Sequence, residues 1–271
     1  MNPDPPSGPQ GSGPTEVPPE LRPRGLSGSW RGQLWAPPDE PFKALTVAGP
    51  LKVLLAIGVL LDVLIVAVWY LRYSFAQRAV SGGSFTDAEV TTSDMMLGLT
   101  GIGQLLVFTT TGILFIVWVR RAYRNLHPLG VQKLRFKAGW AVGGWFVPFL
   151  NAVRPKEIVN DIWRSTDPDA PREQEGPGLG RPVEQIVNWW WASYLVSQAA
   201  YQFIFRMPIP ETAEQLVNEA QVGMVSDALG AVAGVTAFLA VGAITKRHDE
   251  RAAALGVTGG PPALPVQESV R

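Results

Sequence analysis

The sequence predicts an all-α, polytopic membrane protein with four transmembrane helices. Two observations support this prediction: four long apolar stretches contain few charged residues, and the lysines and arginines gather on one side of them. At about 1.5 Å per helical residue the stretches reach roughly 27 to 39 Å, against about 30 Å for the hydrocarbon core of a bilayer. They run over residues 46–71, 95–119, 188–205 and 222–245.

A tail rich in proline and glycine precedes the first stretch. Residues 1–41 contain eleven prolines and six glycines, with few large apolar side chains. Such a segment cannot bury enough apolar surface to offset the entropy of ordering it, so we expect residues 1–43 to form a disordered cytoplasmic tail. It lacks the pattern of a secretory signal peptide, so we expect the first helix to be uncleaved. A second disordered cytoplasmic tail is expected over 252–271, which leaves a membrane domain at 44–251.

Basic residues predict which way the helices point, because cytoplasmic loops are enriched in lysine and arginine. With both termini in the cytoplasm, 19 of these residues lie inside and three outside, while Lys52 lies at the membrane boundary. The sequence therefore predicts a multi-pass protein of the cytoplasmic (plasma) membrane. Its longest loop, residues 120–187, would be cytoplasmic.

The cytoplasmic loop contains a further apolar piece, residues 139–153. As a helix it would be about 22 Å long, and Pro148 would interrupt it, so it is too short to span the bilayer. A crossing would also divide the basic residues equally, with eleven on each side. We therefore expect a re-entrant or an interface-lying segment. The next residues, 156–164, predict an amphipathic helix, which would lie flat on the membrane or pack its apolar side on the bundle.

Two blocks in and before this loop resemble a known membrane family. They read WVRRAYRNL at 118–126 and LRFKAGWAVGGWFVPFLNAVRPKEIVNDIWRSTDP at 134–168. They are similar to the family called domain of unknown function 4328, which is abundant in actinobacteria. The resemblance implies a polytopic membrane protein over about 44–251 and supplies no reaction. The matching positions are Trp118, Arg121, Ala122, Tyr123 and Asn125 in the first block, and Gly139, Trp140, Gly144, Trp145, Phe146, Pro148, Asn151, Pro155, Ile162, Trp163 and Arg164 in the second.

Three aspartates are candidates for a cation or proton site, because ionisable residues inside membrane helices are costly. Asp62 lies within the first helix and Asp94 caps the outer end of the second, while Asp227 lies near the outer end of the fourth. The three would converge in the outer half of the bilayer. A cation or a proton would then reach them from outside. A structural interpretation of the same residues stays open.

In the structural interpretation, the carboxylates accept hydrogen bonds that specify how the helices pair. The faces that carry them are rich in small residues, which let helices approach closely. Asp227 shares its face with Gly230 and Gly234. Asp94 shares a stripe that we expect to be buried in the bundle, made of Gly98, Gly101, Leu105, Phe108 and Gly112. The hydrogen-bond donors would be Gln104, Gln198, Thr109 or tryptophan indoles.

Basic and aromatic residues of the cytoplasmic loop predict contact with lipid headgroups or with a protein partner. Guanidinium groups meet lipid phosphates at such a boundary, and indole rings prefer the interface. Because this segment is tethered to the membrane, anionic lipid is a simpler partner than nucleic acid. Pairing of glycine-rich faces in a homo-oligomer is a further alternative. The candidate residues are Arg120, Arg121, Arg124, Trp145, Trp163 and Arg164.

The composition argues against an enzyme or a cofactor-binding protein. Cysteine is absent and His127 and His248 stand in separate segments, so neither thiol chemistry nor a histidine metal site is expected. Phosphate-binding, zinc-binding and nucleophile-elbow motifs are also missing. We therefore expect a non-enzymatic scaffold or regulatory component of the membrane. The alternative is a small cation- or proton-coupled transporter or channel that uses the three aspartates.

Overall fold

The computed structural model describes residues 45–84 and 86–257, and within them it contains helices and no β-strand. The all-α prediction is confirmed. The predicted tail at 1–43 lies outside the described residues, as does most of the one at 252–271. The elements are α2 (Ala48–Val80), α3 (Asp87–Arg124), α4 (Trp140–Gly143), the 3₁₀ helix η2 (Leu150–Ala152), α5 (Arg154–Ser165), α6 (Gln185–Phe205) and α7 (Ala213–Leu255).

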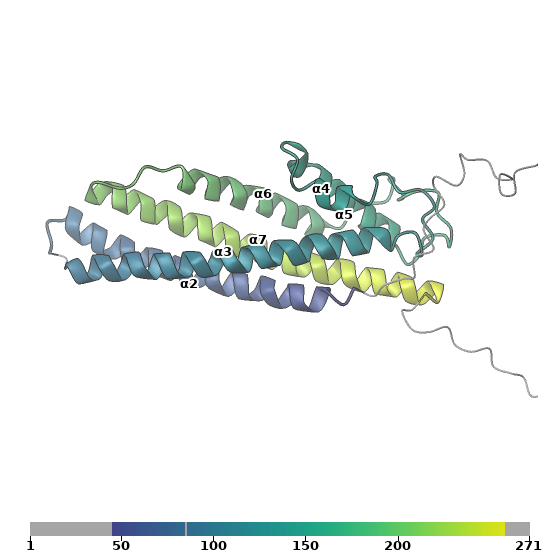
Figure 1. Cartoon of the computed structure of the whole chain (residues 1–271), viewed down its shortest axis with the longest axis horizontal. Helices are drawn as coiled ribbons and strands as arrows, with labels where there is room; N and C mark the ends of the chain where they lie inside the picture. Colours follow the sequence, from purple (N-terminus) through teal and green to yellow (C-terminus); the bar gives the residue numbers. More distant parts are fainter. Residues whose placement is uncertain (1–44, 85, 258–271) are drawn as a thin grey trace, which may run out of the picture. The chain divides into compact units, whose positions relative to one another are not determined.

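Helices α2, α3, α6 and α7 lie side by side as a bundle (Figure 1). α7 contacts both α2 and α6, and α3 packs against α2. The α2–α3 and α6–α7 connections lie at one end of the bundle, which we call the loop end. Residues 125–184, which include α4, η2 and α5, lie at the opposite end, and we call them the cap.

Three of the bundle helices, α2, α3 and α7, are long and apolar enough to cross a membrane. Large apolar side chains such as Leu60, Leu99 and Ile102 are exposed on them. A surface of this kind is better suited to lipid than to water. α6 is not among these three helices, and three tryptophans, two tyrosines and three glutamines interrupt its aliphatic residues.

The helices extend beyond the predicted spans, and local sequence explains where two of them begin. The Thr86 hydroxyl accepts a hydrogen bond from the Glu89 amide, and the Glu89 carboxylate accepts one from the Thr86 amide. Thr212 and Gln215 form the same capping box before α7. Such a box satisfies amides that the first helical turn leaves free. Charged residues lower the hydropathy of these ends, so the predicted spans stop short of the helices.

α7 continues into residues that we expected to be a loose tail. It ends at Leu255, where Gly256 adopts a left-handed conformation with φ of 69°. Glycine adopts this conformation without a steric penalty, which is why it commonly ends helices. Ala252 is buried. The beginning of the predicted C-terminal tail is therefore helical and packed.

The small-residue stripe predicted on α3 faces outward, which corrects the expected orientation of this helix. Gly98 and Gly101 have no neighbouring atom within 4 Å of the position where a Cβ would stand. Leu105 and Phe108 of the same stripe are exposed. The inward face carries Gln104, which finds polar partners there. Hydrogen bonding, rather than packing of small residues, thus determines the rotation of α3.

The glycines of α7 lie against neighbouring helices, as predicted. A Cβ at Gly230 would collide with the Tyr201 hydroxyl of α6. One at Gly234 would stand 2.6 Å from the Val59 side chain of α2. Small residues at these positions let α7 approach both helices closely.

A large apolar core lies where the cap meets the bundle. Ile158 and Ile162 of α5 are fully buried in one cluster with Trp118 of α3 and Ile244 of α7. α5 contacts α3, α6 and α7. Of the two arrangements predicted for this amphipathic helix, the structure has the one in which its apolar side packs on the bundle.

We predict that Gly230→Ala destabilises the bundle. The added methyl group would strike the Tyr201 hydroxyl, and overpacking of this kind costs about 1–3 kcal/mol. Thermal unfolding in detergent should show a midpoint several degrees below that of the unaltered protein. Gly101→Ala is the matched control, because its methyl group meets open space on α3 and alanine favours the helix. Equal midpoints for the two variants would contradict the assigned faces.

Candidate functional site

Two aspartates from different helices meet inside the bundle. Asp62 on α2 and Asp227 on α7 each accept a hydrogen bond from the side-chain amide of Gln104 on α3, at 2.8 and 2.9 Å. Both aspartates are more than nine-tenths buried. The Tyr201 hydroxyl of α6 donates to Asp227 at 3.1 Å. Each bundle helix therefore contributes one residue to a group that we call the carboxylate cluster: Asp62, Gln104, Tyr201 and Asp227.

A tryptophan completes the surroundings of the cluster. Trp69 Nε1 donates to the second oxygen of Asp227 at 2.9 Å, and its ring lies against Gly223, where a Cβ would collide with it. Within the described residues, neither carboxylate has an ion-pair partner, so amide, hydroxyl and indole dipoles offset their charge. In the same part of the chain, no three histidine or acidic side chains are grouped so that they could hold a metal ion.

Sequence reasoning identified some of these donors and missed others. Gln104 and an indole were expected, whereas Thr109 is exposed and Gln198 takes no part in the contacts of the two carboxylates. Trp69 stands seven residues after Asp62, two helical turns along the same face, and this spacing is a signal that could have identified it. The sequence carries no comparable signal for the hydroxyl of α6.

The third candidate, Asp94, makes its contacts elsewhere. It is 59% exposed at the loop end, where Arg72 Nη1 lies 2.5 Å from its carboxylate. Arg72 also pairs with Glu219 of α7 at 3.3 Å. Arg72 falls just beyond the predicted span 46–71, but α2 continues to Val80, so this arginine lies on the helix and reaches α3 and α7. The structure thus brings Asp62 and Asp227 together and leaves Asp94 in a separate ion-pair group.

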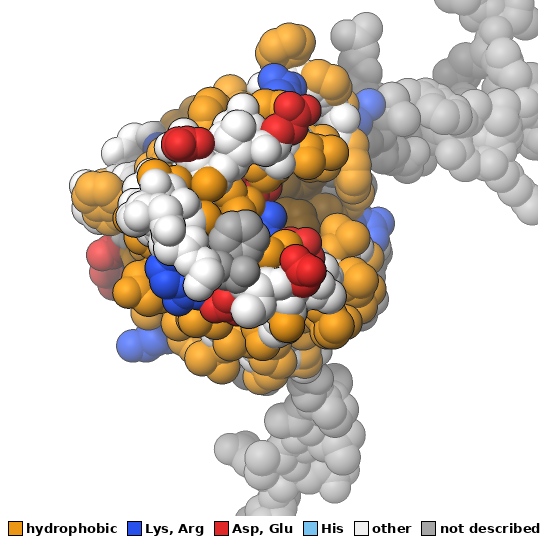
Figure 2. Space-filling view, turned by 90° about the vertical axis from the view of Figure 1, so that its left-hand side faces the viewer, with side chains coloured by type: hydrophobic (Ala, Val, Ile, Leu, Met, Phe, Trp, Pro, Cys, Tyr) orange, Lys and Arg blue, Asp and Glu red, His pale blue; other side chains and the backbone are white. Residues whose placement is uncertain are grey.

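A pocket of about 480 Å³ opens at the loop end. Figure 2 looks onto this end, where charged and apolar side chains surround a hollow. Arg72, Asp94 and Glu219 line the pocket together with apolar residues that include 207–210 between α6 and α7. The carboxylates of the cluster are not among its lining residues.

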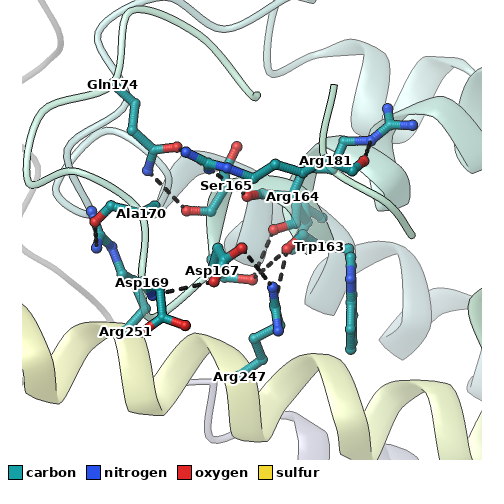
Figure 3. A network of polar contacts seen from close by, with 12 residues as sticks. Trp163, Arg164, Ser165, Asp167, Asp169, Ala170, Gln174, Arg181, Arg247 and Arg251 are labelled. Carbon is teal, nitrogen blue, oxygen red and sulfur yellow. Dashed lines mark hydrogen bonds and ion pairs between the residues drawn. The ribbon is translucent and has the colours of Figure 1, made fainter. Parts of the chain in front are cut away.

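Two arginines near the end of α7 hold the cap (Figure 3). Arg251 is almost fully buried and donates to the carbonyl oxygens of residues 170 and 171, at 2.7 and 2.6 Å. Arg247 donates to the Trp163 carbonyl at 3.2 Å, pairs with Asp167 at 3.3 Å and stacks over the Trp163 ring. A buried guanidinium needs several acceptors, and the cap backbone supplies them. In the sequence both arginines contribute only to the count of basic residues on the cytoplasmic side.

Several residues predicted to bind headgroups or a partner are engaged inside the molecule. Trp163 is buried, and Arg164 donates to a backbone carbonyl of the cap at 2.9 Å. Arg121 donates to a threonine hydroxyl just before α2 at 3.1 Å. Arg120 is exposed and Arg124 is partly exposed. The outward-facing part of the predicted set is therefore smaller than the sequence indicates.

Trp145 attaches the segment after α4 to the bundle. Its ring lies edge-on to Phe115 of α3, with 5.7 Å between centroids. It lies edge-on to Trp191 and Tyr194 of α6, at 6.1 Å in each case. Aromatic pairs in this geometry contribute about 0.5–1.5 kcal/mol each beyond their buried area. The predicted interface tryptophan thus serves as a contact between cap and bundle.

The cap buries a carboxylate that sequence reasoning did not single out. Asp161 of α5 is fully buried and has no hydrogen-bond partner among the described residues. Arg135 lies 3.7 Å from its carboxylate and also pairs with Glu157. Burial raises the pKa of Asp161 to about 6, and the nearby arginines oppose this rise only in part. The titratable groups around it are Tyr123 of α3, Arg135, and Arg154, Glu157 and Arg164 of α5.

Comparison with known proteins confirms the family resemblance. The model of the family described as Domain of unknown function (DUF4328) matches residues 81–246 of this chain. The match is shorter than the expected 44–251: it leaves out α2 with Asp62 and includes the other three members of the carboxylate cluster. No curated protein and no solved structure matches the chain.

We predict that Asp161→Asn stabilises the protein at neutral pH and changes how its stability depends on pH. Because the pKa of Asp161 is raised in the folded state, the folded protein binds this proton more tightly than the unfolded chain does. The contribution of Asp161 to the free energy of unfolding therefore falls as the pH rises from about 4 to about 6, by roughly 1–2 kcal/mol. The variant cannot ionise, so it should exceed the unaltered protein at pH 7.5 and approach it at pH 5.

Denaturant unfolding in detergent at several pH values measures this difference. Asp169→Asn removes an exposed carboxylate from the cap and is the control. A loss of stability in Asp161→Asn at pH 7.5 would show that the pairing with Arg135 outweighs the burial of the charge.

Proposed function

This chain belongs to the DUF4328 family, and we propose that it is a non-enzymatic scaffold or regulatory component of the cytoplasmic membrane. In this proposal all four bundle helices cross the bilayer and the cap and both termini lie in the cytoplasm. α6 supports the fourth crossing, since its 21 residues extend about 30 Å. The cap contains more lysines and arginines than the loop end does, which supports a cytoplasmic position for the cap.

The observation that carries the proposal is the attachment of the cap to α7. Arg247 and Arg251 hold the cap backbone from one side, and the apolar side of α5 packs on the bundle from the other. A fixed surface loses little conformational entropy when it binds a partner, which favours recognition of another protein. Exposed charged side chains on this surface include Lys133, Lys137, Asp169, Arg172, Glu173 and Glu175.

The carboxylate cluster fits a structural role in this proposal. Gln104 joins α3 to α2 and α7, and Tyr201 joins α6 to α7. Hydrogen bonds between membrane helices are a common means of specifying which helices pair and how they are rotated. The cluster would then hold the bundle that carries the cap.

A second function, a cation or proton site of a transporter or channel, is favoured by one observation. Asp62 and Asp227 share a single amide donor and have no ion-pair partner among the described residues. Two such groups in an apolar bundle are costly and would be stabilised by a bound proton or cation. Asp94 has no direct part in this alternative, since Arg72 holds it at the loop end.

We predict that the cap contacts a protein partner in native membranes. A photo-crosslinking residue at Lys133 or Glu175 should form protein adducts, whereas one at Glu214 of the loop end should not. Arg251→Gln should reduce the adducts severalfold, because it leaves cap carbonyls without their donor. Lys246→Gln, which removes an exposed charge from the same helix, is the matched control. Adducts that persist in Arg251→Gln, or that never form at the cap, would contradict the scaffold.

We further predict that the purified protein, reconstituted in vesicles, moves neither protons nor monovalent cations. Flux measured with pH-sensitive and cation-sensitive dyes should stay at the level of empty vesicles, in the unaltered protein and in Asp62→Asn and Asp227→Asn. Flux that the unaltered protein supports and both variants abolish, with Asp94→Asn unaffected, would favour the second function instead.

A further inference from the structure

An apolar turn follows α4, and its two phenylalanines are largely exposed in the described part of the chain. Phe146 and Phe149 are 73% and 91% exposed, and Val147 between them is exposed as well. Pro148 completes the sequence of four residues, 146–149, that we call the apolar turn. Neighbouring exposed apolar side chains of this size mark contact with a second apolar phase rather than with water.

The backbone of the apolar turn is held in an unfavourable conformation. Phe149 has φ of 64°, in the left-handed region that residues with a Cβ rarely adopt. The side chain stays 91% exposed, so packing within the cap does not compensate for this conformation. Strained residues of this kind are retained where the position of the side chain serves a contact.

The base of the turn is fixed to the rest of the cap. Gly144 lies so close to Arg154 that a Cβ would stand 2.8 Å from the arginine Cγ. The Arg154 guanidinium stacks over the rings of Phe136 and Trp140, at 3.9 and 5.5 Å from their centroids. The apolar turn is therefore a fixed projection rather than a loose loop.

The contacts of Trp145, the residue just before the turn, place it beside the apolar part of the bundle. Its partners Phe115 and Tyr194 both lie within stretches that the sequence predicts to cross the membrane. Figure 1 shows the chain around α4 beside α6. The turn therefore lies near the face of α6 that carries Trp191 and Tyr194, beside which Leu195 is exposed.

Basic residues accompany the turn on the cap side. Arg135 before α4 and Arg154 at the start of α5 both pair with Glu157. Lys137 before α4 and Arg120 on the last turns of α3 are exposed. An apolar projection bordered by cations is the pattern of segments that enter the headgroup and acyl boundary of an anionic bilayer.

We infer that the apolar turn inserts into the bilayer as a shallow wedge from the cap side, with phospholipid as its ligand. Acyl chains would surround Phe146 and Phe149, and headgroup phosphates would lie near Lys137 and Arg120. The inference rests on the proposed placement of the bundle in the membrane. It assigns lipid rather than a protein as the occupant, because Trp145 just before the turn packs on Phe115 and Tyr194, which lie in stretches predicted to cross the membrane.

The chain lacks cysteine, so a single introduced cysteine can carry a spin label without further substitutions. Phe149→Cys would be labelled in vesicles of phosphatidylcholine and phosphatidylglycerol, and its collisions with oxygen and with a water-soluble nickel chelate measured by electron paramagnetic resonance. Leu105→Cys on the exposed face of α3 is the lipid control, and Leu179→Cys, exposed in the cap, is the aqueous control. We expect the label at 149 to favour oxygen severalfold, as the label at 105 does, and the label at 179 to favour nickel.

Each other outcome overturns a different statement. A label at 149 that favours nickel, while the label at 105 favours oxygen, would overturn the wedge and leave the membrane bundle intact. A label at 149 that neither reagent reaches would show a protein contact in place of lipid. A label at 105 that favours nickel would contradict the placement of the bundle itself.

Discussion

The side-chain amide of Gln104 sets the arrangement of the bundle. It lies between two buried carboxylates, one from α2 and one from α7, and donates to both. In apolar surroundings a polar group without a partner costs several kcal/mol, so rotating α3 to bury its glycine stripe would be more costly than exposing that stripe. Tyr201 and Trp69 add donors from α6 and α2, and the rotation of every bundle helix is thereby constrained.

The same requirement explains how the cap is attached. α7 has 43 residues and is about 65 Å long, so it extends well beyond a bilayer's hydrocarbon core and reaches the cap. There Arg247 and Arg251 satisfy backbone carbonyls that the cap loop would otherwise leave without donors. One helix therefore carries both Asp227 of the carboxylate cluster and the two arginines of the cap. This continuity supports a role in which the bundle positions a surface for another molecule.

The sequence predicted the parts of the structure that depend on hydropathy and helical periodicity. The long apolar helices, the amphipathic character of α5 and the close-packed glycines of α7 all follow from such patterns. The orientation of α3 did not, because a helical wheel groups residues on a face and does not say which face is inside. Asp94 is a different case. Its partner Arg72 lies beyond the predicted end of the first helix, so the sequence gives no sign of their ion pair. Backbone acceptors such as the carbonyls that bind Arg251 leave no mark in a sequence, so the attachment of the cap could not be predicted.

The central claim, that Gln104 and the two carboxylates hold the helices together, is tested most directly by a double-mutant cycle. Free energies of unfolding in detergent would be compared for Gln104→Leu, Asp227→Asn and the double variant. If the residues act as one hydrogen-bonded unit, the two effects should be coupled by about 1 kcal/mol or more. Effects that add to within about 0.5 kcal/mol would show that the contact does not determine how the helices associate.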